Sequence, residues 1–303
     1  MKSNSVNQQL AKRAQTRLSQ LFDNKIANSN ILVLTSSDDQ GVIRNGGRNG
    51  ARYAPKAILN SLKGLTQNQE TSTWKFSEAE CAKGFDFKKD FTNAQHQSIE
   101  KTKNSLKGFK GKKIVHLGGG HDHIYPLLGS LGNIPIGVIN IDAHLDTRTD
   151  SLTHSGTPFR QFANEHKNKF HLIQMGIHPY ANTQSSYQPL GNNGQMDILD
   201  KKQIPELKTL LEKSDPKMQW VFSLDCDGLH SSIMEAVSAV NHRGIKESEF
   251  IDIFNTYLNY TNNHKQLFGI YEYNPIYDNL SQKGARFLSD IIYQFLTQSK
   301  REE

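Results

Sequence analysis

Asn-Ile-Asp-Ala-His-Leu-Asp, at residues 140–146, is the most informative stretch of this chain. The apolar run at 136–139 precedes it and predicts a buried strand. Asp142, His144 and Asp146 then recur at every second residue, and alternate side chains of an extended chain share one face. Two carboxylates and one imidazole that point to one spot suit a divalent cation such as Mn²⁺. A solvated strand end with a chance acidic pair is the alternative interpretation.

Two other clusters of potential metal ligands also follow predicted strands. Residues 118–123, Gly-Gly-Gly-His-Asp-His, come after the apolar run 114–117. Residues 223–227, Ser-Leu-Asp-Cys-Asp, come after the apolar run 220–222. Because sites in open α/β sheets lie outside the carboxyl ends of the strands, we expect the three strand ends to share one metal site.

Strand and helix signals alternate along most of the chain. We expect strands at 30–35, 113–117, 136–141, 170–177, 218–224 and 267–273, and helices at 5–22, 54–62, 124–131, 158–166, 204–213, 247–260 and 284–297. This alternation predicts an α/β fold, a single three-layer domain with a mostly parallel central sheet flanked by helices. Residues 65–112 are polar and predict only short strand and helix pieces. We expect residues 1–29 to form an N-terminal helical extension and residues 30–303 to form the domain itself.

The composition favours a cytoplasmic enzyme. The net charge is +6, but the basic residues are scattered and no aromatic-basic array appears, so we expect no nucleic-acid binding. No apolar run is long enough to span a membrane, and the polar first 22 residues predict no secretory signal. Cys81 and Cys226 are far apart and indicate neither a disulfide framework nor a zinc knuckle. On a strand, Cys226 would face away from its two acidic neighbours and be buried.

Three of these motifs resemble the metal motifs of the ureohydrolases, the family of arginases, agmatinases and formimidoylglutamases. They are Gly-Gly-Gly-His at 118–121, Asp-Ala-His-Leu-Asp at 142–146 and Ser-Leu-Asp-Cys-Asp at 223–227. The resemblance covers about residues 30–295 and implies an arginase-like fold, with residues 30–303 as the catalytic domain. It also implies two Mn²⁺ ions per subunit, with Ni²⁺ and Co²⁺ as alternatives, and a homo-oligomer.

The resemblance assigns the metal ligands residue by residue. One ion would be bound by His121, Asp142, Asp146 and Asp225, and the other by Asp142, His144, Asp225 and Asp227. Asp142 and Asp225 would then bridge the ions and share in catalysis, since a bridged pair makes hydroxide at neutral pH. Only the His of Gly-Gly-x-His is a ligand in the family. We therefore expect Asp122 to support the ligands or cap a helix, and His123 and His116 to bind no metal.

Glu272 and Asn274 lie in a segment, residues 268–275, that resembles the Glu-x-Asn-Pro motif of the family. The resemblance implies that Glu272 faces the cationic amidine-type nitrogen of the substrate and that Asn274 belongs to the substrate site. A structural ion pair between Glu272 and an arginine is the alternative interpretation.

The glycine-rich segment 38–52 contains three arginines and predicts either a loop close to the site or a flexible surface loop. It resembles the N-terminal signature of formimidoylglutamases, Gly-Val-x-Arg-Asn-x-Gly-Arg-x-Gly-Ala. Residues 146–148, 176–183 and 236–239 resemble segments of the same subfamily, whereas 230–232 and 240 depart from it.

His154 and Ser155 occupy a position that differs within the family. Arginases and agmatinases have a proton-shuttling His directly before the Gly, whereas this chain has Ser155 there, as formimidoylglutamases do. We expect Ser155 to contact substrate. A site role and a solvent-facing loop both remain open for His154, because a shift of one residue can turn a side chain to the opposite face.

The resemblance thus implies a hydrolase of linear amidines, closest to formimidoylglutamases, which split N-formimidoyl-L-glutamate into glutamate and formamide in histidine degradation. That substrate carries two carboxylates, and planar guanidinium groups bind carboxylates through paired hydrogen bonds. We expect Arg48 and Arg148 to serve this role, with Arg44 as a further candidate. The alternatives are a guanidino hydrolase similar to agmatinases or arginases, and a metal-binding relative without turnover.

Overall fold

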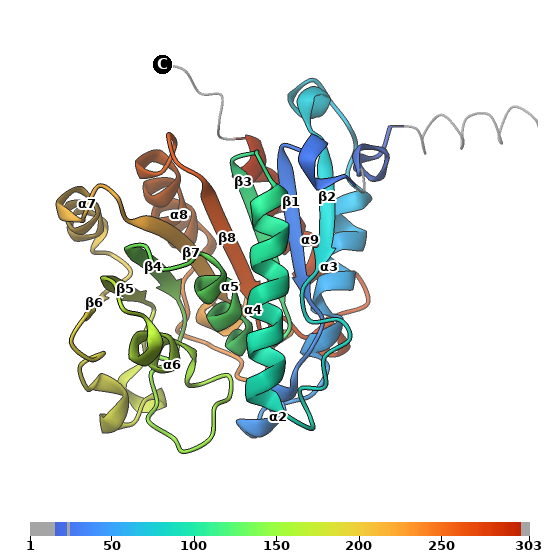
Figure 1. Cartoon of the computed structure of the whole chain (residues 1–303). Helices are drawn as coiled ribbons and strands as arrows, with labels where there is room; N and C mark the ends of the chain where they lie inside the picture. The colour runs from blue at the N-terminus through green and yellow to red at the C-terminus, as the bar shows by residue number, and fades with distance from the viewer. Residues whose placement is uncertain (1–15, 23–24, 298–303) are drawn as a thin grey trace, which may run out of the picture.

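One parallel sheet forms the centre of the computed structural model, which describes residues 16–22 and 25–297 (Figure 1). Its eight strands follow the order β2-β1-β3-β8-β7-β4-β5-β6, and every neighbouring pair is parallel. The strands are β1 (Ile31–Ser36), β2 (Phe76–Glu80), β3 (Lys113–Gly118), β4 (Ile136–Ile141), β5 (Phe170–Met175), β6 (Gly194–Leu199), β7 (Gln219–Asp225) and β8 (Gln266–Tyr271). The predicted α/β fold is confirmed.

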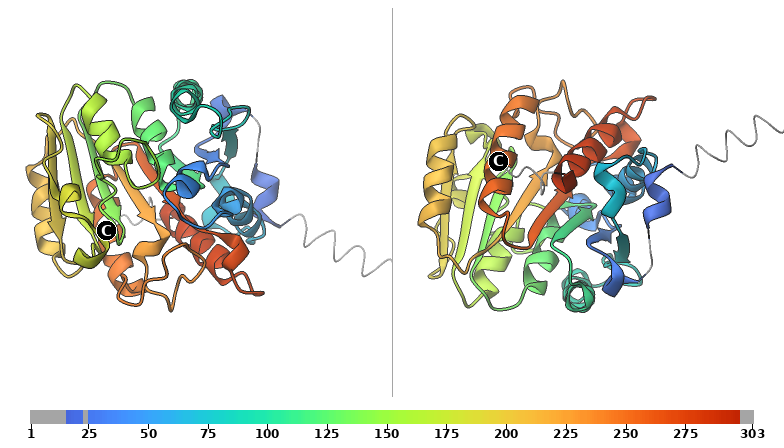
Figure 2. Two further views of the ribbon diagram at one scale, coloured as in Figure 1. Left: turned by 90° about the horizontal axis from the view of Figure 1, so that it is seen from below. Right: turned by 90° about the horizontal axis from the view of Figure 1, so that it is seen from above.

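Helices connect the strands and cover both faces of the sheet, as the end-on views in Figure 2 show. The α-helices are α2 (Gln40–Arg44), α3 (Ala54–Lys63), α4 (Phe91–Gly108), α5 (Ile124–Ser130), α6 (Pro158–Glu165), α7 (Ile204–Lys213), α8 (Glu247–Tyr260) and α9 (Lys283–Thr297). Short 3-10 helices are η1 (Leu18–Leu21), η2 (Ile26–Asn28), η3 (Ala51–Tyr53), η4 (Glu70–Thr73), η5 (His121–His123), η6 (Pro179–Ala181), η7 (Gln184–Tyr187), η8 (Cys226–Gly228) and η9 (Pro275–Tyr277).

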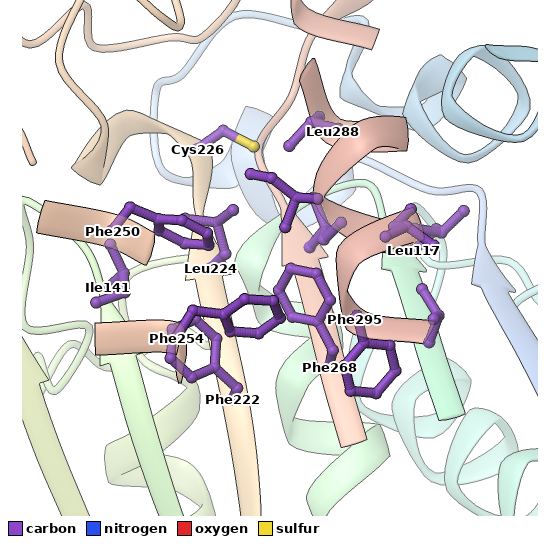
Figure 3. Close-up of a cluster of buried hydrophobic side chains, with 14 of the residues drawn as sticks. Leu117, Ile141, Phe222, Leu224, Cys226, Phe250, Phe254, Phe268, Leu288 and Phe295 are labelled. Atoms are coloured by element: carbon purple, nitrogen blue, oxygen red, sulfur yellow. The ribbon is translucent and has the colours of Figure 1, made fainter. Parts of the chain in front are cut away.

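The two faces of the sheet carry separate hydrophobic cores, so the domain has three layers. Helices α3, α7, α8 and α9 pack over one face, and α4, α5 and α6 pack over the other. In the first core the Phe254 ring of α8 lies 4.8 Å from the Phe222 ring of β7 and 4.8 Å from the Phe268 ring of β8 (Figure 3). Cys226 is also buried in this core, as predicted, although it lies in η8 directly after β7 rather than on the strand. Each buried phenylalanine contributes about 1.5–3 kcal/mol to folding.

Strand β6 and helix α2 were not predicted, and β2 and α4 lie in the segment 65–112, for which only short strand and helix pieces were expected. The long helix α4 buries mostly small or polar side chains, namely Phe91, Ala94, Gln95, Ser98 and Thr102. Such a face has no strong apolar periodicity. Strands β2 and β6 are the two edges of the sheet, where one flank is solvated and the apolar pattern is weak. Helix α2 spans only five residues inside the glycine-rich segment.

The predicted helix 5–22 lies mostly outside the described residues. Within residues 16–22 the structure has the short helix η1, and its Leu18 is buried against the first core. A separate N-terminal extension at 1–29 stays a prediction. In the described part of the chain, the helices are all too short or too polar to cross a membrane.

Candidate active site

The ligand-bearing motifs follow four neighbouring strands of the sheet, β3, β8, β7 and β4. Because these strands are parallel, their carboxyl ends lie together at one end of the sheet. The ends are also nearly level, since Asp225 of β7 pairs with Tyr271 of β8 and Ile141 of β4 pairs with Leu224 of β7. The topology therefore brings the three predicted clusters to one place, as the sequence motifs imply.

One group of buried ligand atoms surrounds the imidazole of His121 and consists of His121, Asp142, Asp146 and Asp225. The Nδ1 atom of His121 lies 2.8 Å from Oδ2 of Asp146. Oδ2 of Asp142 and Oδ2 of Asp225 each lie 3.2 Å from the same nitrogen. Within the described residues this nitrogen makes no hydrogen bond. Three carboxylate oxygens and one imidazole nitrogen thus converge on a point where a cation fits the donor set.

A second group lies beside the first and consists of Asp142, His144 and Asp227. The Nδ1 atom of His144 is 3.5 Å from Oδ1 of Asp142 and 3.2 Å from Oδ2 of Asp227. Asp142 therefore offers one oxygen to each group, which suits a bridging carboxylate. Asp225 belongs to the first group only, and its Oδ1 accepts a hydrogen bond of 3.0 Å from the Asp227 amide. A bridging role for Asp225 stays a prediction.

Hydrogen bonds from neighbouring residues orient these ligands. Ser223 Oγ lies 2.9 Å from Nε2 of His121, so Nδ1 is left for a metal ion. Oδ1 of Asp142 accepts a hydrogen bond of 2.7 Å from the amide of His144. The side-chain nitrogen Nδ2 of Asn140 donates to the other oxygen of Asp142, Oδ2, at 3.3 Å. Both oxygens of the shared carboxylate are thereby held in place.

The backbone of the ligand loop is bent, which corrects one expectation. The strand ends at Ile141, and Asp146 has a φ of 51°, so the chain is not extended from Asp142 to Asp146. The left-handed turn, rather than strand alternation, brings Asp146 to the same spot. Glu272 has a φ of 62°. Each such residue costs on the order of 1–3 kcal/mol, and strain of this kind concentrates at functional sites.

Burial makes the acidic cluster unfavourable unless positive charge accompanies it. It raises the pKa of Asp146 to about 6, with the neighbouring Asp142 adding to the effect. Burial also raises the pKa of Asp225 well above its ordinary value. For His144 burial alone would lower the pKa, but the carboxylates of Asp227 and Asp142 raise it to about 12. Buried carboxylates are stable only when paired or metal-bound, so the site fits two divalent cations.

A cavity of about 360 Å³ opens above the ligands. Its lining consists of Val42, Asn45, Gly46, Gly47, His144, Asp146, Arg148, Ser155, Ala181, Asn182, Thr183, Ser186, Asp225, Asp227, Ser238, Ala239 and Glu272. A larger cavity of about 620 Å³ lies at the opposite end of the sheet, where the strands begin, beside Ile31 and Lys113. We assign the substrate site to the smaller cavity because it alone of these two adjoins the ligand groups.

Glu272 lies in the cavity beside the ligands and is buried. Its Oε1 accepts a hydrogen bond of 3.0 Å from the amide of His121. Burial raises the pKa of Glu272 to about 8, so this carboxyl group is largely protonated at neutral pH unless positive charge lies beside it. Within the described residues its carboxylate has this backbone partner rather than an arginine, which argues against the ion-pair interpretation.

The structure separates the predicted substrate-binding residues into two sets. Arg148 and Ser155 line the cavity, whereas Arg48 and Asn274 do not. The Arg48 guanidinium lies 4.9 Å from the centre of the Tyr277 ring. The Asn274 side chain is buried and donates to the Asn49 carbonyl at 2.9 Å. In this structure both residues therefore support the glycine-rich loop.

The glycine-rich loop is fixed to the domain and forms part of the cavity wall. Oδ2 of Asp39 accepts a hydrogen bond of 2.6 Å from the amide of Gly50, which closes the loop at its base. Arg44 lies outside the cavity, with its guanidinium 4.4 Å from the centre of the Phe91 ring. The interpretation as a loop close to the site is supported over that of a flexible surface loop.

The histidines that were left out of the ligand set lie away from the ligand groups. His154 is buried, and its Nε2 lies 2.8 Å from Oδ2 of Asp150, so it does not face solvent. His116 is a core residue whose nitrogens contact Ser36 and Tyr271, and burial lowers its pKa to about 3. His123 contacts the Asp38 carbonyl.

Several cavity residues were missed in the sequence analysis, among them Asn45, Asn182, Ser186 and Ser238. Asn182 is the clearest case, because its Oδ1 accepts from the amide of Leu145 at 2.8 Å and its Nδ2 donates to the Ala143 carbonyl at 3.1 Å. It thereby fixes the loop that carries the ligands. Asn182 and Ser238 lie inside segments with a subfamily resemblance, which was the only available signal.

Comparison with known proteins agrees with this site. The model of the arginase family matches residues 36–297. The chain belongs to the arginase family. It is therefore a ureohydrolase-type metal hydrolase that acts on small molecules, with a buried cluster of histidine and aspartate ligands.

The named relatives of this arginase-family chain are similar to it over most of their length. The chain is 28% identical to formimidoylglutamase of Klebsiella pneumoniae over 279 residues, which cover 87% of this chain and 84% of the relative. The formimidoylglutamase of Staphylococcus aureus is 27% identical over 286 residues, or 88% and 86% of the two chains. The structure of Trypanosoma cruzi formiminoglutamase with Mn²⁺ matches with a TM-score of 0.77 at 25% identity, over 94% of this chain and 99% of that one.

Replacing Asp225 by alanine tests the predicted metal centre. If Asp225 touches both ions, the Asp225→Ala protein should lose both, or nearly so, when it is purified with Mn²⁺ and its metal content is measured. Asp252→Ala, at an exposed position on α8, is the matched control and should keep the wild-type content. Two ions per chain in Asp225→Ala would refute the assignment.

Proposed function

We propose that the protein hydrolyses the C–N bond of a linear amidine, with N-formimidoyl-L-glutamate as the best candidate. The observation that carries this proposal is the charge distribution of the cavity. Acidic groups, including Glu272, lie beside the metal ligands, and the guanidinium of Arg148 lines the same cavity. A substrate with a cationic amidine at one end and a carboxylate at the other complements such a site. The names of the relatives, formimidoylglutamases, support the same class.

Each group in the cavity then has a role in the reaction. A pair of divalent ions, proposed to be Mn²⁺ and held by His121, Asp142, His144, Asp146, Asp225 and Asp227, would supply hydroxide from water at neutral pH. The carboxylate of Glu272 would bind the cationic nitrogen of the amidinium group and so hold the amidinium carbon in place. Arg148 and Ser155 would hold a carboxylate. The oxygen of water ends in formamide, and the amine of glutamate leaves with a proton.

A guanidino hydrolase is the second candidate function. Its substrates differ from N-formimidoyl-L-glutamate in the charge that they would place at the far end of the cavity. Agmatine has no carboxylate and carries a second cation, which would face the like charge of Arg148. Arginine does carry a carboxylate, but its α-ammonium group would also lie near that arginine. For the second carboxylate of N-formimidoyl-L-glutamate, Thr183 and Ser186 of the same cavity wall would be candidate donors. Homo-oligomer formation and a cytoplasmic location stay predictions.

A comparison of substrates tests the function directly. We expect the Mn²⁺-loaded protein to release glutamate and formamide from N-formimidoyl-L-glutamate with a higher kcat/KM than it shows for agmatine or arginine. Faster turnover of agmatine or arginine would refute the substrate and leave the metal hydrolase in place. No release of amine from any of the three would favour the relative without turnover.

Replacing Glu272 by glutamine tests its role at the cationic end. Glutamine keeps the shape and the oxygen that accepts from the His121 amide, so metal content should be unchanged. Loss of the oriented charge should lower kcat/KM by a factor on the order of 10²–10³. Wild-type kinetics in Glu272→Gln would return this residue to a structural role.

Replacing Arg148 by alanine tests the carboxylate end. We expect the KM for N-formimidoyl-L-glutamate to rise at least about tenfold, the scale of one charge-assisted hydrogen bond. Arg48→Ala, measured in parallel, ranks the two predicted arginines, and its effect should be smaller because Arg48 lies on Tyr277. Arg286→Ala, at an exposed position on α9, is the control. A KM unchanged in Arg148→Ala would remove this residue from the site.

A further inference from the structure

We propose that Asn45 is a positioning residue that sets the direction of a hydrogen-bond chain, so that Arg148 and Ser155 both donate to one carboxylate of the substrate. The inference rests on the proposed function and adds a residue to which no role has been assigned. Asn45, Arg148 and Ser155 all line the cavity. Their side chains form a row in which the amide of Asn45 lies between the other two.

The direction of this chain follows from the chemistry of its members. A guanidinium can only donate hydrogen bonds, and Nη2 of Arg148 donates to Oδ1 of Asn45. The carboxamide oxygen must therefore face Arg148, which turns the amide nitrogen toward Ser155. Nδ2 of Asn45 then donates to Oγ of Ser155 at 3.1 Å. The arginine thus fixes the orientation of the amide, which could otherwise be flipped.

The consequence is a hydroxyl group that is left to donate. A serine oxygen that accepts from an amide still carries its own proton. Among the described residues, the Ser155 hydroxyl donates to no acceptor, and the residue is only 6% exposed. Because Ser155 lines the cavity, an anionic group bound there is the natural acceptor. A carboxylate would receive one hydrogen bond from Arg148 and one from Ser155.

The backbone holds all three residues in register. Asn45 follows the last residue of α2, and its amide donates to the Gly41 carbonyl at 3.1 Å. The amide of Ser155 donates to the same carbonyl at 3.1 Å, which ties the two loops together. The Arg148 side chain lies across Gly156, where an added Cβ would come within 2.7 Å of Nε. On its other side, Nη1 of Arg148 is 3.6 Å from Oδ2 of Asp150.

Aspartate at position 45 has the same shape as asparagine, but it would reverse the direction of the hydrogen bond between residue 45 and Ser155. A carboxylate accepts but cannot donate, so the Ser155 proton would turn toward residue 45 and the charge of Arg148 would be offset. We expect Asn45→Asp to raise the KM for N-formimidoyl-L-glutamate at least about tenfold. Its kcat should stay within about twofold, because Glu272 and the metal ligands are unchanged.

A double-mutant cycle on the Mn²⁺-loaded protein tests the proposal. Ser155→Ala alone should raise KM about three- to tenfold, as loss of one hydrogen bond does. The double variant Asn45→Asp, Ser155→Ala should resemble Asn45→Asp within about twofold, since the hydroxyl is already diverted. If the two effects multiply instead, the hydroxyl acts independently of Asn45 and the proposal is overturned. A wild-type protein inactive on this substrate would refute the proposed function itself, before any variant is compared.

Two further variants separate positioning from general damage. Asn45→Ala removes both hydrogen bonds and introduces no charge, so its KM should rise about three- to tenfold with kcat nearly unchanged. It also serves if Asn45→Asp fails to fold, and an unchanged KM would overturn the proposal. Asn168→Asp makes the same chemical change beside the amino end of β5, where the side chain bonds the Asn133 carbonyl, and should leave KM unchanged. Metal content and Tm are measured for every variant.

Discussion

Four carboxylates buried at the ends of adjacent parallel strands are the constraint on which the rest of this structure depends. Asp142, Asp146, Asp225 and Asp227 are each less than a tenth exposed, and two imidazoles lie among them. Removing unpaired charges from water costs several kcal/mol per ion even after relaxation. The arrangement needs compensating positive charge, and we expect metal binding and the folding of this end of the sheet to be coupled. The left-handed backbone of Asp146 is the local strain that this convergence requires.

Different parts of the fold position the metal ligands and the residues proposed to select the substrate. The metal ligands sit at the ends of central strands, with a hydrophobic core on each face of the sheet. The cavity wall consists mostly of loops, and side chains hold those loops in addition to backbone hydrogen bonds. The Asn182 side chain forms hydrogen bonds with the loop that carries the ligands. Asp39 closes the glycine-rich loop, and Asn274 donates to two backbone carbonyls of that loop. Substrate preference can therefore change through the loops while the hydrolytic site stays intact.

The same division explains what the sequence could predict. The central strands were predictable because apolar runs are local patterns, and the candidate ligands because the motifs that follow these strands resemble those of a known family. Helix α4 was missed because it buries small polar side chains, and the edge strands because one flank is solvated. Arg148 and Arg48 were both expected to bind a carboxylate, since both lie in segments that resemble formimidoylglutamases. Only the folded chain shows that Arg148 lines the cavity and that Arg48 lies on Tyr277. The role of Asn45 depends on contacts across about a hundred residues, which no local pattern encodes.

Opposite charges within one cavity attract each other, and the structure has to keep them apart. Arg148 shares the cavity with Glu272 and with the acidic ligands, and an untethered guanidinium would be drawn toward them. Asn45 on one side and Asp150 on the other hold it at the wall, and packing against Gly156 restricts it further. Because Asn45 is neutral, it does not offset the positive charge, and the half-exposed Asp150 at 3.6 Å offsets it only in part. A substrate that is cationic at one end and anionic at the other can then bind between the two groups, without first breaking an ion pair between them.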